Sequence, residues 1–143
     1  MNARDLVGSY VGAGRDYMAK DGTVTNTGGG NGAHPARIVY TREGLVMALS
    51  TPADRANTGA KEPALASLEQ KARMAEGVVA YAGRYDMKDG KVRHHIEVSL
   101  FPDLVGRTAV RTPSFEGNRL TLTTEPDEQG GVQRIYWERV SQA

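Results

Sequence analysis

The stretch "VRHHIEVSLFP" (residues 92–102) alternates apolar and polar side chains, which is the pattern of a β-strand with one buried face. One side carries a histidine and the apolar residues, namely His94, Ile96, Val98 and Leu100. Burying each large aliphatic side chain is worth roughly 1.5–3 kcal/mol, whereas burying the unpaired charges of the other side would cost more. We therefore expect this apolar side, with His94, to face the interior.

Similar alternating segments surround this strand and are separated by turns that contain glycine. Glycine supplies the positive φ that hairpin turns require, and Asp89-Gly90 directly before the quoted stretch is one such turn. The pattern predicts eight strands, at residues 6–18, 38–41, 45–50, 78–87, 92–101, 107–112, 119–124 and 132–140, with a short ninth at 22–26.

Eight antiparallel strands joined by consecutive hairpins favour an all-β, up-and-down β-barrel, because closure removes the unpaired sheet edges. The interior of an eight-stranded barrel is just wide enough for side chains or one small ligand. A β-sandwich could use the same strands, but the consecutive hairpins favour the barrel. The 143 residues are enough for one such domain, which we expect to span residues 1–143.

Two segments interrupt the strand pattern. Residues 62–77 predict one amphipathic helix of about four turns, with Pro63 near its start and Gly77 at its end, which caps or flanks the barrel. The glycine-rich residues 26–35 predict a loop at the barrel mouth. They are not a phosphate-binding fingerprint, because proline and a strand follow them instead of a helix.

The composition excludes several classes of function. A net charge of +1 gives no reason to expect binding to nucleic acid or to an anionic membrane. The absence of cysteine excludes disulfides, thiolate metal sites and a cysteine nucleophile. No apolar run approaches the roughly 20 residues of a membrane helix or resembles a signal peptide. We expect a soluble, cytoplasmic protein without a cofactor.

Four segments of the sequence resemble the bacterial lipocalin-like domain family of small, calycin-like β-barrels. They are "LVGSY", "YAGRYDMKDGKVRHHIEVSLFPDLVGRTAVR", "EGNRLTLTT" and "YWERV", which cover most of the chain in the right order. The resemblance implies a barrel whose lumen holds a small, largely apolar molecule. Similar barrels serve as carriers, and some in natural-product pathways act as cofactor-free cyclases.

The resemblance also implies a pair of residues that closes one end of the barrel. Lipocalins carry Gly-x-Trp on the first strand and an arginine on the last strand that packs on this tryptophan. Here Gly8 and Tyr10 stand in the first place and Arg139 in the second, with tyrosine replacing tryptophan. An arginine over an aromatic ring contributes roughly 0.5–2 kcal/mol, so the role expected for this pair is structural.

His94 is the candidate catalytic residue. A histidine in an apolar lumen stays neutral near pH 7 and suits a general base or a group that orients a ligand. The alternative is a core histidine bonded to a tyrosine or a backbone carbonyl. On the opposite face we expect cross-strand ion pairs, with His95 among them, rather than a metal site, because the remaining histidine, His34, lies in the glycine-rich loop.

Aromatic residues are the candidate ligand contacts. Tyr81 and Tyr85 flank Gly83 on one side of the neighbouring strand, where glycine leaves room for a ligand or another backbone. Tyr40 and Trp137 lie on other strands, and we expect Trp137 rather than its neighbour Tyr136 to face inward. Aromatic rings fix a ligand in an apolar pocket, and the alternative is that these rings fill the core.

Ile96, Val98 and Arg111 complete the expected ligand site. Arg111 could offer its donors to a carboxylate or enolate near the barrel mouth, although such arginines more often lie on the surface. Three functions remain open: a carrier of a small apolar or amphipathic molecule, a cofactor-independent cyclase, isomerase or lyase, and a structural dimerising domain with a filled barrel. The expected partners are therefore the small ligand and, as an alternative still open, a second copy of the chain.

Overall fold

The computed structural model describes residues 1–27 and 35–141. Nine antiparallel strands form one sheet in the order β2-β1-β3-β4-β5-β6-β7-β8-β9. The strands are β1 (Gly8–Met18), β2 (Val24–Asn26), β3 (Ala36–Tyr40), β4 (Leu45–Ser50), β5 (Val79–Lys88), β6 (Lys91–Ser99), β7 (Thr108–Glu116), β8 (Arg119–Thr124) and β9 (Val132–Ser141).

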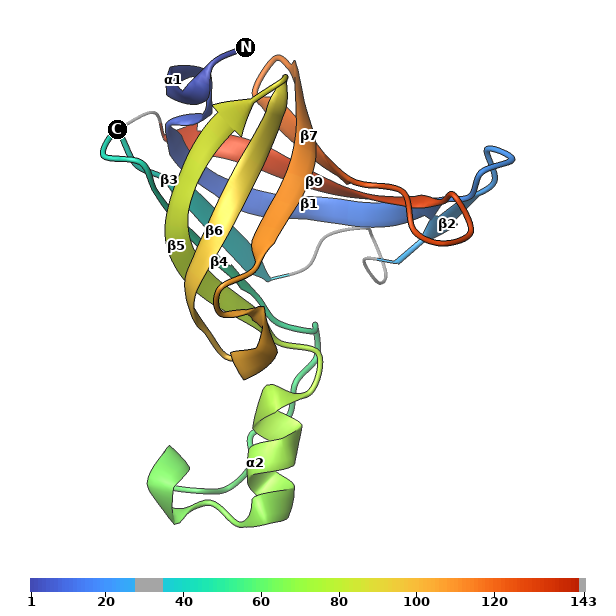
Figure 1. Ribbon diagram of the computed structural model, residues 1–143. Coiled ribbons are helices and arrows are strands. Elements are labelled where there is room, and N and C mark those ends of the chain that lie inside the picture. Colours follow the sequence, from blue (N-terminus) through green and yellow to red (C-terminus); the bar gives the residue numbers. More distant parts are fainter. Residues whose placement is uncertain (28–34, 142–143) are drawn as a thin grey trace.

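Pairing of β1 with β9 closes eight of these strands into a barrel, and β2 is an extra strand on the outer part of β1. Figure 1 shows β1 and β9 continuing beyond the barrel body as a long ribbon that ends beside β2. The expected barrel and its nine segments are confirmed. Most bounds agree within about two residues, because each turn carries its own glycine signal.

The helix in the long β4–β5 connection exists but is shorter than expected. Residues Pro63–Leu65 form a short 3-10 turn (η1), and helix α2 covers only Leu68–Ala75. Ser67 is the N-cap: its hydroxyl accepts from the Gln70 amide, and the Gln70 side chain accepts from the Ser67 amide. This capping box, rather than the proline, sets the start of the helix.

Helix α2 projects from the barrel instead of packing on it (Figure 1). None of its residues is buried, and Leu68 is 85% exposed. Within the described residues, no helix is long and apolar enough to cross a membrane.

One end of the barrel is sealed. Helix α1 (Ala3–Leu6) lies across it, and its Leu6 side chain is fully buried. The Tyr10 hydroxyl donates to the Leu6 carbonyl at 2.6 Å, which ties the helix to the first strand. The apolar core lies mostly behind this seal, with members such as Val46, Leu120 and Trp137.

A β-bulge changes the facing of β6 halfway along the strand. On β5, Gly83 pairs with Ile96, and the residue before it, Ala82, pairs with Val98. Glu97 is therefore an extra residue on β6. A Cβ on Gly83 would lie 1.9 Å from the backbone oxygen of His95, so only glycine fits this close approach.

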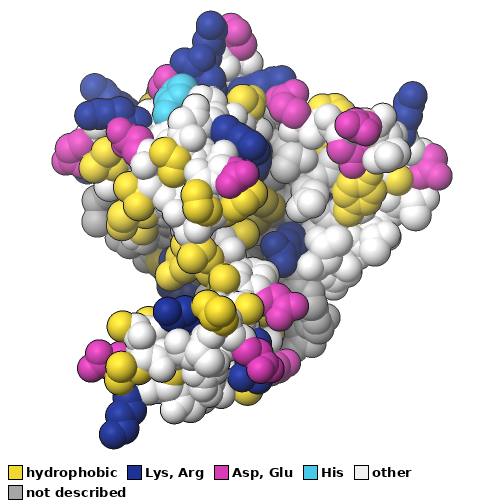
Figure 2. All heavy atoms as spheres, turned by 60° about the horizontal axis from the view of Figure 1, so that its bottom comes forward, with side chains coloured by type: hydrophobic (Ala, Val, Ile, Leu, Met, Phe, Trp, Pro, Cys, Tyr) yellow, Lys and Arg dark blue, Asp and Glu magenta, His cyan; other side chains and the backbone are white. Residues whose placement is uncertain are grey.

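The expected inward orientation of Val98 and Leu100 is therefore wrong. Ile96 is buried as expected, whereas Val98 is 68% exposed and Leu100 is also exposed. Beyond the bulge, the apolar residues of β6 cover the outer surface. Figure 2 shows hydrophobic side chains gathered on the face toward α2. We call these residues the outer apolar face: Met47, Leu49, Val98, Leu100, Phe101 and Val105.

Candidate functional site

A histidine bonded to two tyrosines occupies the middle of the barrel. The Tyr40 hydroxyl lies 2.7 Å from His94 Nε2, and the Tyr81 hydroxyl lies 2.7 Å from His94 Nδ1. Strands β3, β5 and β6 each supply one member. The inward face of His94 is confirmed, since the side chain is only 1% exposed, and both ring nitrogens have hydrogen-bond partners.

Burial keeps this group neutral. Loss of hydration lowers the pKa of His94 from 6.5 to about 3, and the positive charge of Arg111 acts in the same direction. Burial also raises the pKa of Tyr81, and raises that of Tyr40 well above its usual value, so both hydroxyls stay protonated near neutral pH. The three side chains therefore form an uncharged chain of hydrogen bonds.

The two tyrosines differ in exposure. Tyr40 is fully buried on the side of the sealed end, whereas Tyr81 is half-buried on the side of the open end. Other inward-facing residues at the open end are also half-buried, namely Ala48, Ala109, Arg111 and Thr124. Tyr81 therefore separates the buried His94 from the open half of the lumen and is the member of the chain that a molecule there can contact.

Arg111 faces the same part of the lumen. It pairs with Val92 and Thr124, whose strand neighbours on the same face are His94 and Leu122, both buried. Its Nη1 donates to the Val110 carbonyl at 2.8 Å. The structure thus places Arg111 inside the barrel and not on its outer surface.

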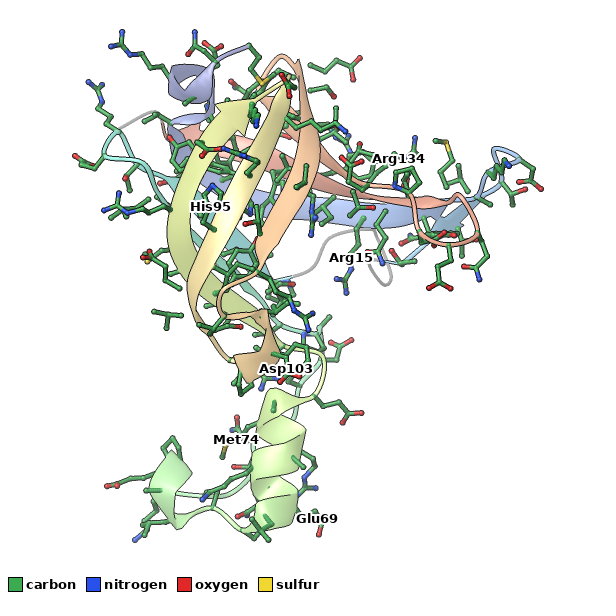
Figure 3. All side chains as sticks on the ribbon, viewed as in Figure 1. Arg15, Glu69, Met74, His95, Asp103 and Arg134 are labelled. Carbon is green, nitrogen blue, oxygen red and sulfur yellow. The ribbon has the colours of Figure 1, made fainter. Side chains whose placement is uncertain are left out.

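A second arginine at the open end was not expected from the sequence. Arg15 pairs with Ile135, which shares the inward face of β9 with Trp137. Figure 3 shows Arg15 and Arg134 leaving the β1–β9 ribbon on opposite sides. A bulge between Gly12 and Gly14 shifts the alternation of β1, so simple counting from the buried Tyr10 would have placed Arg15 outside.

Two of the expected ligand contacts lie in the packed core near the sealed end. The Tyr85 ring packs on the edge of Tyr40 at 4.8 Å between centroids, and its hydroxyl donates to the Thr41 carbonyl at 2.8 Å. Trp137 faces inward as expected and is 5% exposed, while Tyr136 is outside and donates to Asp16 at 2.7 Å. The burial of Tyr85 and Trp137 fits the alternative that aromatic rings fill the core.

Tyr10 and Arg139, the pair expected to close one end of the barrel, are in contact. The Arg139 guanidinium lies 5.2 Å from the centre of the Tyr10 ring and donates to its hydroxyl from Nη2 at 2.6 Å. It also packs over Phe115 at 4.7 Å and donates to the Asp5 carbonyl. Arg139 thereby joins both chain ends and α1 at the sealed end of the barrel.

The outer face of β5 and β6 carries the expected ion pairs. Arg93 binds Asp86 through two hydrogen bonds of 2.6 and 2.8 Å, and His95 Nε2 lies 3.0 Å from the same carboxylate. Arg93 and His95 together lower the pKa of Asp86 to about 2. His95 Nδ1 contacts the Thr108 hydroxyl at 3.0 Å.

His34 and most of the glycine-rich loop lie outside the described residues.

Two surface hollows lie away from the lumen. One, of about 950 Å³, lies beside α1 at the sealed end and includes Arg4, Arg42 and Arg139. The other, of about 410 Å³, lies within the connection that carries α2. Neither includes His94, Tyr81 or Arg111.

The closed antiparallel sheet with one sealed end places this protein in the class of small β-barrel proteins. Residues 18–140 match the model of the lipocalin-like domain family, and the chain belongs to this family, as the sequence resemblance predicts.

Two solved structures are similar. A lipocalin-like protein from Bacteroides uniformis ATCC 8492 shares 13% identity, with a TM-score of 0.47 and coverage of 95% of this chain and 99% of that one. An uncharacterized protein from Bacteroides eggerthii DSM 20697 shares 11% identity, with a TM-score of 0.48 and coverage of 95% and 100%. A comparison with curated proteins found no match.

Proposed function

We propose that the protein binds a small, largely apolar molecule in the open half of its barrel lumen. The observation that carries this proposal is the uneven filling of the barrel. Large side chains pack the sealed half, whereas small residues such as Ala48 and Ala109 face inward at the open end and are only half-buried. An eight-stranded barrel has room for one such molecule.

The polar groups in the open half of the lumen would orient the ligand. Tyr81 presents a hydroxyl that His94 holds from behind, and Arg111 supplies donors on the adjacent wall. A few placed polar groups among apolar walls are the usual composition of a small-molecule site. Ile96 adds a buried apolar surface beside His94.

A neutral fluorescent probe, phenylnaphthylamine, tests this proposal. We expect its fluorescence to rise on binding, and Ala109→Phe to abolish the rise by filling the lumen opposite His94. Ala82→Phe is the matched control, because it adds the same ring to the outer face of β5. Equal binding by both variants, with circular dichroism showing both folded, would locate the probe elsewhere and contradict lumen binding. Native mass spectrometry of the purified protein would then identify a natural occupant.

Binding is favoured over catalysis by the acid–base properties of His94. A general base works best with a pKa near the operating pH, and the pKa of His94 is about 3. His94 is also covered by Tyr81, so it cannot touch a ligand directly.

The hydrogen-bond chain supports a cofactor-independent isomerase as the second candidate. In that case Tyr81 would give its proton to one atom of the substrate and then, as a phenolate held by His94, take a proton from another atom of the substrate, so that the enzyme returns to its starting state. If a substrate is found, a Tyr81→Phe variant that still binds it but no longer turns it over would favour the enzyme over the carrier.

We also propose that two copies of the chain associate. An eight-residue helix is too short to be stable alone in water, yet in α2 and η1 Leu68 and Leu65 are largely exposed. The outer apolar face is likewise uncovered in the described structure. Two copies can cover both surfaces if α2 of each lies on the outer apolar face of the other. Light scattering should then give a dimer mass, which Leu68→Glu reduces to that of a monomer; a monomer at all concentrations would refute this.

A further inference from the structure

The hydrogens of the Tyr40–His94–Tyr81 chain can be assigned from burial. The Tyr40 hydroxyl is fully buried, and the described residues offer it one polar contact, His94 Nε2 at 2.7 Å. A buried O–H without an acceptor is strongly disfavoured. Tyr40 therefore donates to Nε2, which leaves the single proton of the neutral ring on Nδ1.

This assignment fixes the direction of the next hydrogen bond. His94 Nδ1–H donates to the Tyr81 oxygen, 2.7 Å away, so that oxygen is an acceptor in this contact. The Tyr81 O–H is then not used by His94 and remains available to the open half of the lumen, where Tyr81 is half-buried. The chain thus holds Tyr81 as a hydrogen-bond donor toward whatever occupies the lumen.

Arg111 adds a positive charge to the same region. Two arginines on the outward faces of the strands are neutralised by carboxylates: Arg93 binds Asp86, and Arg134 binds Asp16 at 2.7 Å. Among the described residues, Arg111 has no ion pair, and its one hydrogen bond goes to the backbone carbonyl beside it. The charge is close enough to lower the pKa of His94 and to oppose the rise in that of Tyr81.

No acidic side chain balances this charge inside the barrel. At the inward-facing positions of the described strands there is no aspartate or glutamate: Asp16, Asp86 and Glu138 lie on outward faces, and Glu97 and Glu116 are exposed. Arg15 adds a second inward cation, and its Nε donates to the Thr27 carbonyl at 3.2 Å. Within the described residues, the open half of the lumen therefore carries donors and positive charge without a matching negative charge.

We propose that Arg111 and the Tyr81 hydroxyl form an anion-binding pair, so that the ligand is an amphipathic monoanion whose carboxylate or enolate meets this pair. The proposal rests on the lumen binding proposed above and specifies the class of ligand. The fork of guanidinium donors suits two oxygens of one carboxylate, and the apolar body of the ligand would extend toward Ile96 and Ala109. Polar molecules with two or more positive charges are excluded by the same charges.

Two probes with the same aromatic skeleton test this proposal. Anilinonaphthalene sulfonate carries one negative charge, and phenylnaphthylamine carries none. We expect Arg111→Gln to raise the dissociation constant of the sulfonate about tenfold or more and to change that of the neutral probe less than twofold. Tyr81→Phe should weaken the sulfonate several-fold with little effect on the neutral probe.

Arg84→Gln is the matched control, because it removes the same charge from the outward face of β5. Equal weakening of the sulfonate by Arg84→Gln and Arg111→Gln would show a general charge effect and overturn the proposal. Weakening by Arg42→Gln or Arg15→Gln, but not by Arg111→Gln, would place the anion elsewhere and also overturn it. Unchanged sulfonate affinity in Arg111→Gln, with neutral binding intact, would refute the anion pair and leave lumen binding standing. Failure of both probes to bind would remove both proposals.

Discussion

The buried His94 predicts how the stability of the fold depends on pH. In the unfolded chain its pKa is about 6.5, and in the folded protein it is about 3. Between these values the unfolded state binds the proton more readily, so lowering the pH favours unfolding. The stabilisation is complete above about pH 6.5 and is lost progressively down to about pH 3.

The size of the effect follows from the separation of the two pKa values. Each pKa unit corresponds to about 1.36 kcal/mol, so His94 alone should remove about 2 kcal/mol between pH 7 and pH 5. The upper limit near pH 3 is about 4–5 kcal/mol. Urea unfolding followed by the fluorescence of Trp137, the only tryptophan in the sequence, measures this directly.

His94→Gln is the informative variant, because glutamine can still offer one donor and one acceptor but does not titrate. It is expected to unfold with a free energy that changes little between pH 7 and pH 5, whatever its absolute stability. If the original protein and His94→Gln lose the same free energy over this range, His94 is not the buried neutral group described here.

Three further substitutions test the packing. Gly83→Ala should destabilise by about 3 kcal/mol or more, seen in the melting temperature, because its Cβ would collide with the backbone of His95; a change below about 1 kcal/mol would contradict the bulge. Arg139→Gln should lower stability by about 1–3 kcal/mol through loss of its bonds and ring contact with Tyr10, and no change in urea midpoint would exclude the closing role. Leu122→Ala should cost about 2–5 kcal/mol in urea unfolding, and a loss near zero would mean that this part of the barrel is not packed.

The sequence alone predicts the barrel well, because its turns are marked by glycine and its strands alternate. The inward face of His94 and the choice of Trp137 over Tyr136 follow from the same alternation, whereas the closing contact of Arg139 with Tyr10 was expected from the resemblance to lipocalins. The two tyrosine partners of His94 were named as candidate contacts, but their convergence on both ring nitrogens depends on pairing between distant strands. No local pattern contains that information.

The errors come from places where alternation is interrupted. The bulge opposite Gly83 turns Val98 outward, against the prediction, and the bulge between Gly12 and Gly14 turns Arg15 inward, a residue for which the sequence pattern made no prediction. In both cases a glycine is present in the sequence, but it does not reveal whether it serves a turn or a bulge. The helix was overestimated because Pro63 satisfied the pattern of a helix start, whereas the capping box at Ser67 begins the helix one turn later.

The seal made by α1, Tyr10 and Arg139 has a practical consequence for handling the protein. Both ends of the described chain meet there, since Ser9 pairs with Ser141 and α1 lies over the same end (Figure 1). A fusion tag or a surface linkage at either terminus will therefore leave the opposite opening unobstructed. An immobilised barrel would then present its open end to the solution, and the ligand proposed above would enter and leave the lumen through that end.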